Sequence, residues 1–258
     1  MKREIDIVRI EEGNQTVRKD LVASEFPLTI ILNGKELATL LCSPKSMKYL
    51  AIGFLYSEGL IETREEIKKI VLDEEKGVAT IETVEQKDLA QEFFLKRVIT
   101  TGCGRAIAFY NLADIDGANE VVSEIKLSAT DVFTLIKEFQ HRSDLYRVTG
   151  GVHSAALCDP EGILIFEEDI GRHNAIDKIL GKCFLEDIPT SDRIVITSGR
   201  ISSEILFKVA KRNIPVIISK SAPTDIGITL AQELKVTIIG FARGKRMNVY
   251  SGAWRITT

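Results

Sequence analysis

The second half of the chain alternates short apolar runs with amphipathic stretches, and this alternation limits the fold more than any other feature. Three runs rich in β-branched residues lie at 194–196, 216–218 and 236–239. Residues with helical spacing separate them, at 201–210 and 224–234. A βαβαβ succession of this kind indicates a mainly parallel sheet whose faces are covered by helices. We therefore expect an α/β domain over residues 121–258.

The first 120 residues predict a smaller α+β region. Asn33-Gly34 separates two β-rich runs, and this pair is a strong hairpin signal because both residues tolerate a positive φ. Ser43-Pro44 then precedes apolar residues at helical spacing, a pattern that Gly59 ends. Two further strands are expected at 70–72 and 78–83.

The middle of the chain joins these two regions. The polar residues 114–120 are typical of a linker or flexible loop. Ser128 and Asp131 form a variant capping box, and the apolar residues behind it predict a helix of about three turns. The turn sequence Asp159-Pro-Glu-Gly162 then predicts a hairpin, and a helix is expected at 176–183.

Composition excludes several classes of protein. The chain has 258 residues and a net charge of -3, which gives no general attraction for nucleic acid. Its four cysteines show no C-x-x-C spacing, so we expect neither structural disulfides nor a cysteine-based metal site. No signal peptide or membrane span is present, and we expect a cytoplasmic protein. The sequence also lacks the Walker A, dinucleotide-binding and zinc deaminase motifs.

Three loops that follow the predicted parallel strands have the composition of an anion site. They are residues 197–200, 219–224 and 240–246, and each contains small residues and at least one cation. The carboxyl ends of parallel strands meet at one sheet edge, where backbone N–H groups and cations bind phosphate oxygens. Each loop taken alone is equally typical of an ordinary helix cap or a solvated turn. Their succession predicts a phosphate or pyrophosphate site.

The strongest candidate for a reactive residue is Cys103, which lies between Gly102 and Gly104 and is followed by Arg105. The glycines allow a tight turn that exposes the sulfur. The apolar residues 106–109 favour the start of a helix, and a helix N-terminus beside an arginine favours the thiolate. The alternative is a small buried cysteine flanked by turn glycines.

A second polar group stands at the end of a predicted strand. Arg172, His173 and Asn174 combine a bidentate cation, a titratable imidazole and an amide. His153, Asp169 and His173 are alternatively partners of Cys103 in a Cys/His hydrolase, although the order and spacing match no hydrolase signature. A purely structural role for both histidines is the alternative.

Several of these segments together resemble the formate dehydrogenase accessory sulfurtransferase family, FdhD. The resemblance covers nearly the whole chain and includes the Asn33-Gly34 hairpin and residues 50–59. Its most specific motifs are Thr101-Gly-Cys-Gly104, Val148-Thr-Gly-Gly-Val-His-Ser-Ala155, Glu168-Asp-Ile-Gly-Arg-His-Asn-Ala-Ile-Asp-Lys178, Thr197-Ser-Gly-Arg-Ile-Ser-Ser-Glu204, Ser219-Lys-Ser-Ala-Pro-Thr224 and Gly240-Phe-Ala-Arg-Gly-Lys-Arg-Met-Asn-Val-Tyr250.

The resemblance implies a sulfurtransferase that works as a sulfur carrier. Such a protein receives sulfur as a persulfide from a cysteine desulfurase. It passes the sulfur to the bis-molybdopterin guanine dinucleotide form of the molybdenum cofactor, before this cofactor enters formate dehydrogenase. The implied fold of the C-terminal part is a cytidine deaminase-like three-layer α/β/α sandwich, and the implied assembly is a homodimer.

The resemblance also implies roles for particular residues. Cys103 would be the catalytic persulfide position, and GDP or GMP would mimic the cofactor at the segment formed by Phe241, Ala242, Arg243, Gly244, Lys245 and Arg246. Many family members have a second cysteine, as Cys-Gly-x-Cys-Gly, and this chain has Ala106 there. A single-persulfide carrier is therefore expected. The alternatives are the Cys/His hydrolase, acting on a nucleotide-like substrate, and a cofactor chaperone without catalytic function.

Overall fold

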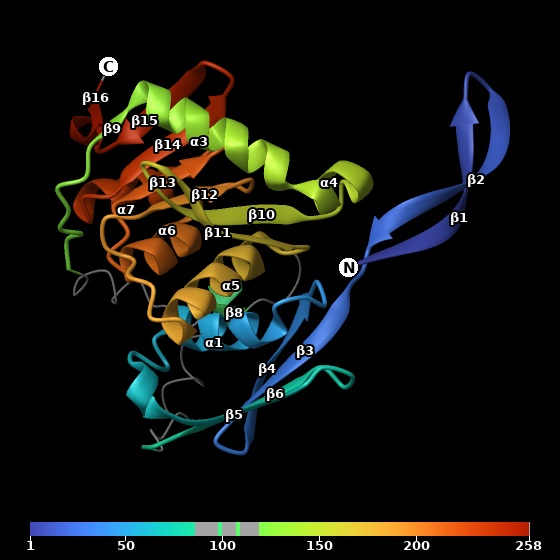
Figure 1. The fold of residues 1–258 in the computed structure, drawn as a ribbon, viewed down its shortest axis with the longest axis horizontal. Helices are drawn as coiled ribbons and strands as arrows, with labels where there is room; N and C mark the ends of the chain where they lie inside the picture. The colour runs from blue at the N-terminus through green and yellow to red at the C-terminus, as the bar shows by residue number, and fades with distance from the viewer. Residues whose placement is uncertain (86–97, 100–106, 109–118, 258) are drawn as a thin grey trace.

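The computed structural model describes residues 1–85, 98–99, 107–108 and 119–257. Within these residues the chain forms a projecting N-terminal hairpin, a small α+β unit and a larger α/β unit (Figure 1). The fold class is thus the α/β class that the alternation in the second half predicts.

The larger unit is built on a six-stranded sheet with the order β11-β10-β12-β13-β14-β15. Its strands are β10 (His153–Asp159), β11 (Gly162–Asp169), β12 (Ile194–Thr197), β13 (Val216–Ser219), β14 (Thr237–Arg243) and β15 (Arg246–Ser251). The three central strands are parallel, as expected from the helices that connect them. Tight turns join β10 to β11 and β14 to β15, and such turns require the antiparallel pairing that both edges of the sheet show. The sheet is therefore mixed, with its parallel part confined to the centre.

Helices cover both faces of this sheet. The helix α3 (Ala129–Arg142) packs on one face, where its apolar residues share a core with alternate residues of β10, β12 and β13. The opposite face packs against α5 (Arg172–Leu185), α6 (Ser203–Ala210) and α7 (Asp225–Glu233). The result is the expected α/β/α arrangement (Figure 1). The capping box at Ser128 is present, since Ser128 and Asp131 exchange side-chain to backbone hydrogen bonds of 3.1 and 2.8 Å.

The smaller unit is a four-stranded sheet with one helix packed on it. Its sheet order is β4-β3-β6-β5. The hairpin of β3 (Phe26–Leu32) and β4 (Lys35–Cys42) turns at Asn33 and Gly34, both with positive φ, as the sequence predicts. A short 3-10 helix, η1 (Arg64–Glu66), precedes the pair β5 (Ile67–Asp73) and β6 (Val78–Thr83). The helix α1 (Met47–Glu58) packs its apolar residues against this sheet and ends at Gly59.

Two glycines let the units approach closely through α1 and α5. A Cβ at Gly53 would lie 1.7 Å from the backbone oxygen of Asp177, and a Cβ at Gly181 would lie 1.9 Å from that of Tyr49. The two helices therefore touch backbone to backbone. Beside this contact the buried Lys208 ammonium lies 2.8 Å from Asp177 and 3.1 Å from Glu58, so it neutralises charges from both units.

Several elements differ from what the sequence predicts. Residues 107 and 108, expected to open a helix, form strand β8 (Ile107–Ala108), which pairs with β7 (Val98–Ile99). A short apolar run does not distinguish a strand from a helix, and here strand pairing prevails. Elements that the pattern did not indicate are β1 (Lys2–Glu11), β2 (Asn14–Ala23), β9 (Leu127–Ser128), α4 (Asp144–Thr149), η3 (Ala253–Arg255) and β16 (Ile256–Thr257). No helix in the described part of the chain is long and apolar enough to span a membrane.

The backbone contact between α1 and α5 leads to a stability prediction. Gly53→Ala should destabilise the protein by ~3 kcal/mol or more, because the added methyl group overlaps a carbonyl that cannot move without separating the helices. In an unobstructed helix the same change would stabilise by about 1 kcal/mol. The urea unfolding midpoint measures the effect.

Gly162→Ala is the matched control, since the nearest atom to its added Cβ is a flexible Glu138 oxygen at 3.6 Å. We expect the control to change stability by less than about 1 kcal/mol. A Gly53→Ala protein as stable as this control would contradict the close helix contact.

Candidate functional site

A cavity of about 860 Å³ opens at the sheet edge where the parallel strands end. The loops after β12, β13 and β14 all contribute to its wall, as expected for adjacent parallel strands. They provide Ser198, Lys220, Ser221, Arg243 and Gly244. The start of β10 and the α3–α4 region provide the remaining residues, which are Phe139, Gln140, Ser143, Tyr146, Gly150, Gly151, Val152, His153 and Ser154, with Ile170 after β11.

Hydrogen bonds between neighbouring loops hold this edge in place. The Ser219 hydroxyl donates to the backbone oxygen of Gly199 at 2.6 Å, which ties the β13 loop to the β12 loop. The Phe241 N–H donates to the Ser221 oxygen at 3.1 Å, which ties the β14 loop to the β13 loop. A Cβ at Gly240 would lie 2.9 Å from the Tyr250 ring and 3.2 Å from that same Ser221 oxygen, so a larger residue there would displace its neighbours. These contacts connect the three loops of the wall to one another.

Two cations lie close together on this wall. The Arg243 guanidinium donates to the backbone oxygen of Lys220 at 3.1 and 3.3 Å. Burial and the neighbouring Arg243 charge lower the pKa of the Lys220 ammonium. Within the residues that the structure describes, neither side chain forms an ion pair with a carboxylate. Two adjacent cations without a carboxylate partner among the described residues form a site suited to an anion.

His153 contributes a neutral group to the same cavity. Its Nδ1 lies 3.2 Å from the Ser198 hydroxyl, which also accepts the Ser154 N–H at 3.0 Å. Burial lowers the pKa of the imidazole, and the charges of Arg172 and His173 lower it further. At neutral pH His153 is therefore uncharged and available as a hydrogen-bond donor or acceptor.

The other predicted polar residues lie beside the cavity without lining it. His173 Nε2 is 3.0 Å from Glu204 Oε2, which links the first turn of α5 to the first turn of α6. The Arg172 side chain packs against Gly199, where a Cβ would lie 2.9 Å from it. Asn174 donates to the Leu41 oxygen and to Asp169, both at 2.9 Å, so it connects the two units.

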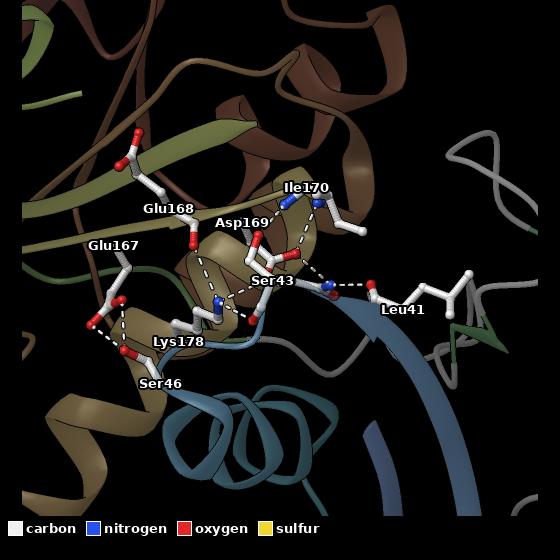
Figure 2. Close-up of polar contacts among 10 residues, drawn as sticks. Leu41, Ser43, Ser46, Glu167, Glu168, Asp169, Ile170 and Lys178 are labelled. Carbon is white, nitrogen blue, oxygen red and sulfur yellow. Dashed lines mark hydrogen bonds and ion pairs between the residues drawn. The ribbon is translucent and has the colours of Figure 1, made fainter. Parts of the chain in front are cut away.

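Asp169 is the centre of a buried polar network at the same edge (Figure 2). Its carboxylate lies 2.6 Å from the Lys178 ammonium, and both side chains are 0% exposed. It also accepts the N–H groups of Ser43 and Gly171 at 3.0 and 2.9 Å. Lys178 in turn donates to the backbone oxygens of Ser43 and Glu168. This network holds the β4–α1 connection against the end of β11 and the start of α5.

The three cysteines that the structure describes are all buried. They are Cys42, Cys158 and Cys183. Burial is the main cause that raises the pKa of each thiol, to about 12 for Cys42 and for Cys183. A protonated, buried thiol is a poor nucleophile, so none of the three is suited to sulfur transfer. Cys103, the predicted reactive residue, lies outside the described residues.

The predicted cofactor-binding segment, residues 241–246, is placed in part at the cavity. Arg243 and Gly244 line it, whereas Ala242 is buried in the core under α3. Phe241 is half-buried with a φ of 51°, and Lys245 and Arg246 are exposed outside the lining. The segment thus turns between β14 and β15, and only its middle, Arg243 and Gly244, lines the cavity.

Sequence reasoning did not single out Gln140 or Tyr146 as site residues. It included Lys220 only as the cation of the second strand-end loop, 219–224, and this residue lies directly after the buried parallel strand β13 and lines the cavity. Gln140 and Tyr146 come from the α3–α4 region, which folds over the sheet edge. No local pattern indicates that placement.

The environment of His153 leads to a prediction about pH. Its pKa in the folded protein is below the ordinary value of 6.5, so the unfolded chain binds the proton first as the pH falls. The stabilisation by the neutral imidazole is therefore fully present above pH 6.5 and decreases as the pH falls below this value. His153→Gln should flatten the loss of stability between about pH 7 and pH 5, measured by urea unfolding. The exposed His141→Gln should keep the wild-type slope, and a slope unchanged in His153→Gln would contradict the assignment.

Comparison with known proteins places the chain among relatives of similar length. Residues 23–257 match the model of the FdhD/NarQ family. The sulfur carrier protein FdhD of Bacillus pumilus is 46% identical, over 100% of this chain and 98% of that protein. The protein of the same name from Bacillus subtilis is 45% identical, over 97% of this chain and 96% of that protein.

A solved structure shows the same fold. It is the crystal structure of a protein assigned as a formate dehydrogenase accessory protein from Desulfotalea psychrophila, 25% identical to this chain. The TM-score is 0.82, and the match covers 99% of both chains. Sequence and fold agree over nearly the full length, and the chain belongs to the FdhD/NarQ family.

Proposed function

We propose that this protein is a cytoplasmic, homodimeric sulfur carrier that serves formate dehydrogenase. It takes sulfur from a cysteine desulfurase as a persulfide on Cys103 and transfers it to the bis-molybdopterin guanine dinucleotide cofactor before that cofactor is inserted. Membership of a family of sulfur carrier proteins supports the general role.

The first step needs a single reactive thiol. The Cys103 thiolate attacks the outer sulfur of the desulfurase persulfide; a new S–S bond forms at Cys103 and the desulfurase cysteine leaves as a thiolate. This exchange consumes no oxidant or reductant. The burial and raised thiol pKa of the other three cysteines support Cys103 as the acceptor.

The observation on which the cofactor part rests is the pair of cations, Lys220 and Arg243, on the wall of one cavity. The guanine dinucleotide cofactor is the cargo, and each of its nucleotide ends has a pyrophosphate. A volume of about 860 Å³ is ample for one such end, since pockets for small ligands measure about 300–1,000 Å³. Lys220, Arg243 and nearby backbone N–H groups would bind the pyrophosphate, and His153 would add a neutral hydrogen bond. The roles of Phe241, Lys245 and Arg246 stay predictions.

The first functional prediction concerns the thiol. Cys103→Ala should abolish the gain of one sulfur atom, measured by mass spectrometry after incubation with a cysteine desulfurase and cysteine. The same variant should fail to support formate dehydrogenase maturation, because no other thiol is available to replace it.

Cys158→Ala is the matched control, since it removes a buried thiol and should leave persulfide formation intact. A sulfur adduct that persists in Cys103→Ala would overturn the assignment. An acyl adduct on Cys103 would instead favour the Cys/His hydrolase, and normal maturation by Cys103→Ala would favour the chaperone.

The second prediction concerns the cations. Lys220→Ala and Arg243→Ala should each weaken GDP binding about 10- to 100-fold, since a hydrogen bond to a charged group contributes about 1.5–3 kcal/mol. Isothermal titration calorimetry measures the affinity. Arg200→Ala is the control, because this exposed cation ends the first loop without lining the cavity. Unchanged GDP affinity in both cavity variants would remove the cavity as the nucleotide site.

A further inference from the structure

The N-terminal hairpin is an arm that stands clear of the body of the protein (Figure 1). Its strands β1 and β2 pair along their full length, and Glu12 and Gly13 form a two-residue turn with positive φ. Its base is anchored, where the Ser24 N–H donates to the Met1 oxygen and Ala23 packs near Gly151. The match to the family model begins at residue 23, so the arm precedes the part that this model describes.

The arm exposes apolar side chains near its tip. Val8 is opposite Val17 in the register, and Ile10 lies two residues along the same face. These three side chains are 60%, 77% and 64% exposed, respectively. A two-stranded hairpin has at best marginal stability in water, so an arm with an apolar tip is expected to be covered by a partner.

A second exposed apolar patch lies at the base of the arm. The helix α4, against which β2 packs, exposes Tyr146 and Val148 by 51% and 45%. Val17 is six residues from Ala23 at the base, so the two patches are separated by about 20 Å along the arm. When two copies lie with the tip of each arm at the base of the other, the tip patch of each copy covers the base patch of its partner. A single two-fold axis relates these two contacts.

The charges of the arm favour a copy of itself over a strongly charged partner. Its cations are Lys2, Arg3, Arg9, Arg18 and Lys19, and its anions are Glu4, Asp6, Glu11, Glu12 and Asp20. The two signs balance, which gives no attraction for a polyanion or polycation. Equal numbers of both signs suit an isologous contact, in which the same surface serves as both partners.

The area is also sufficient. One face of a ribbon about 33 Å long and about 10 Å wide covers roughly 330 Å². In this arrangement each copy contributes one arm face and one receiving surface of the same size, so each buries roughly 700 Å² of accessible surface. This area is close to the ~800 Å² per partner of a standard stable interface.

We propose that the hairpin of residues 2–23 is a dimerisation arm, whose tip packs on α4 and the arm base of a second copy. The proposal rests on the homodimer of the proposed function and assigns its interface. Because Tyr146 also lines the cavity, the arm of the second copy reaches the rim of the ligand site.

The test is a Val8→Thr, Ile10→Thr, Val17→Thr variant of the full chain. Threonine keeps β propensity and shape while removing apolar contact, so the arm stays a hairpin. Sedimentation equilibrium should show a dimer for the wild type and a dimer dissociation constant at least about tenfold higher for the variant. Val71→Thr, Val84→Thr, Val122→Thr is the matched control, since these valines are exposed away from the arm and should leave the dimer intact.

A photo-cross-linking amino acid in place of Val17 gives an independent readout. Irradiation of the pure protein should give a covalent dimer whose cross-link maps to α4 or the arm base. A wild type that stays monomeric, a triple variant that dimerises as well as the wild type, or a cross-link that maps to another surface would each overturn the proposal. A monomeric wild type would also remove the homodimer from the proposed function. None of these outcomes affects persulfide formation on Cys103 or GDP binding, so the sulfur-carrier proposal fails separately.

Discussion

The buried pair of Asp169 and Lys178 is the interaction on which the arrangement of the two units depends. A buried carboxylate and ammonium are tolerated only when their remaining hydrogen-bonding capacity is also satisfied. Here the partners that satisfy it come from both units, because Ser43 supplies an N–H to Asp169 and a carbonyl to Lys178 (Figure 2). Moving the β4–α1 connection by even one residue would leave these charges without their partners. The pair therefore fixes geometry, whatever its net contribution to stability.

This geometry also determines where the cavity lies. Asp169 ends β11 and is paired in register with His153, which lines the cavity from the start of β10. Ile170, the next residue, reaches the wall itself, and its N–H donates to the Ser43 hydroxyl. One layer away, the glycine contact between α1 and α5 and the Lys208 ion pairs set the separation of the same units. The edge that holds the cations is thus supported from the N-terminal unit, although the described residues that line the cavity all come from the larger unit.

Much of the fold was predictable because its determinants are local. Asn33-Gly34, the Ser128 capping box and the alternation of apolar runs each act within a few residues, and each predicted its element correctly. The predictions failed where pairing across the chain decides the outcome. Residues 107–108 form a strand because 98–99 pair with them, and β1 pairs with β2 although charged residues interrupt its pattern. The position of the three loops at one sheet edge was predictable from the order of the strands. Which cations line the cavity was not, because the direction of the β14–β15 turn places Arg243 in the lining and Lys245 and Arg246 outside it.

The order of the cavity wall bears on the anion site of the proposed function. Its loops are tied to one another by backbone and serine hydrogen bonds, so binding does not have to order them. The lowered pKa of Lys220 shows that its charge is disfavoured by burial and by Arg243, and a bound phosphate would relieve both costs. In the described part of the chain neither cation forms an ion pair with a carboxylate. Under the proposed function, the pyrophosphate of the ligand would be their partner.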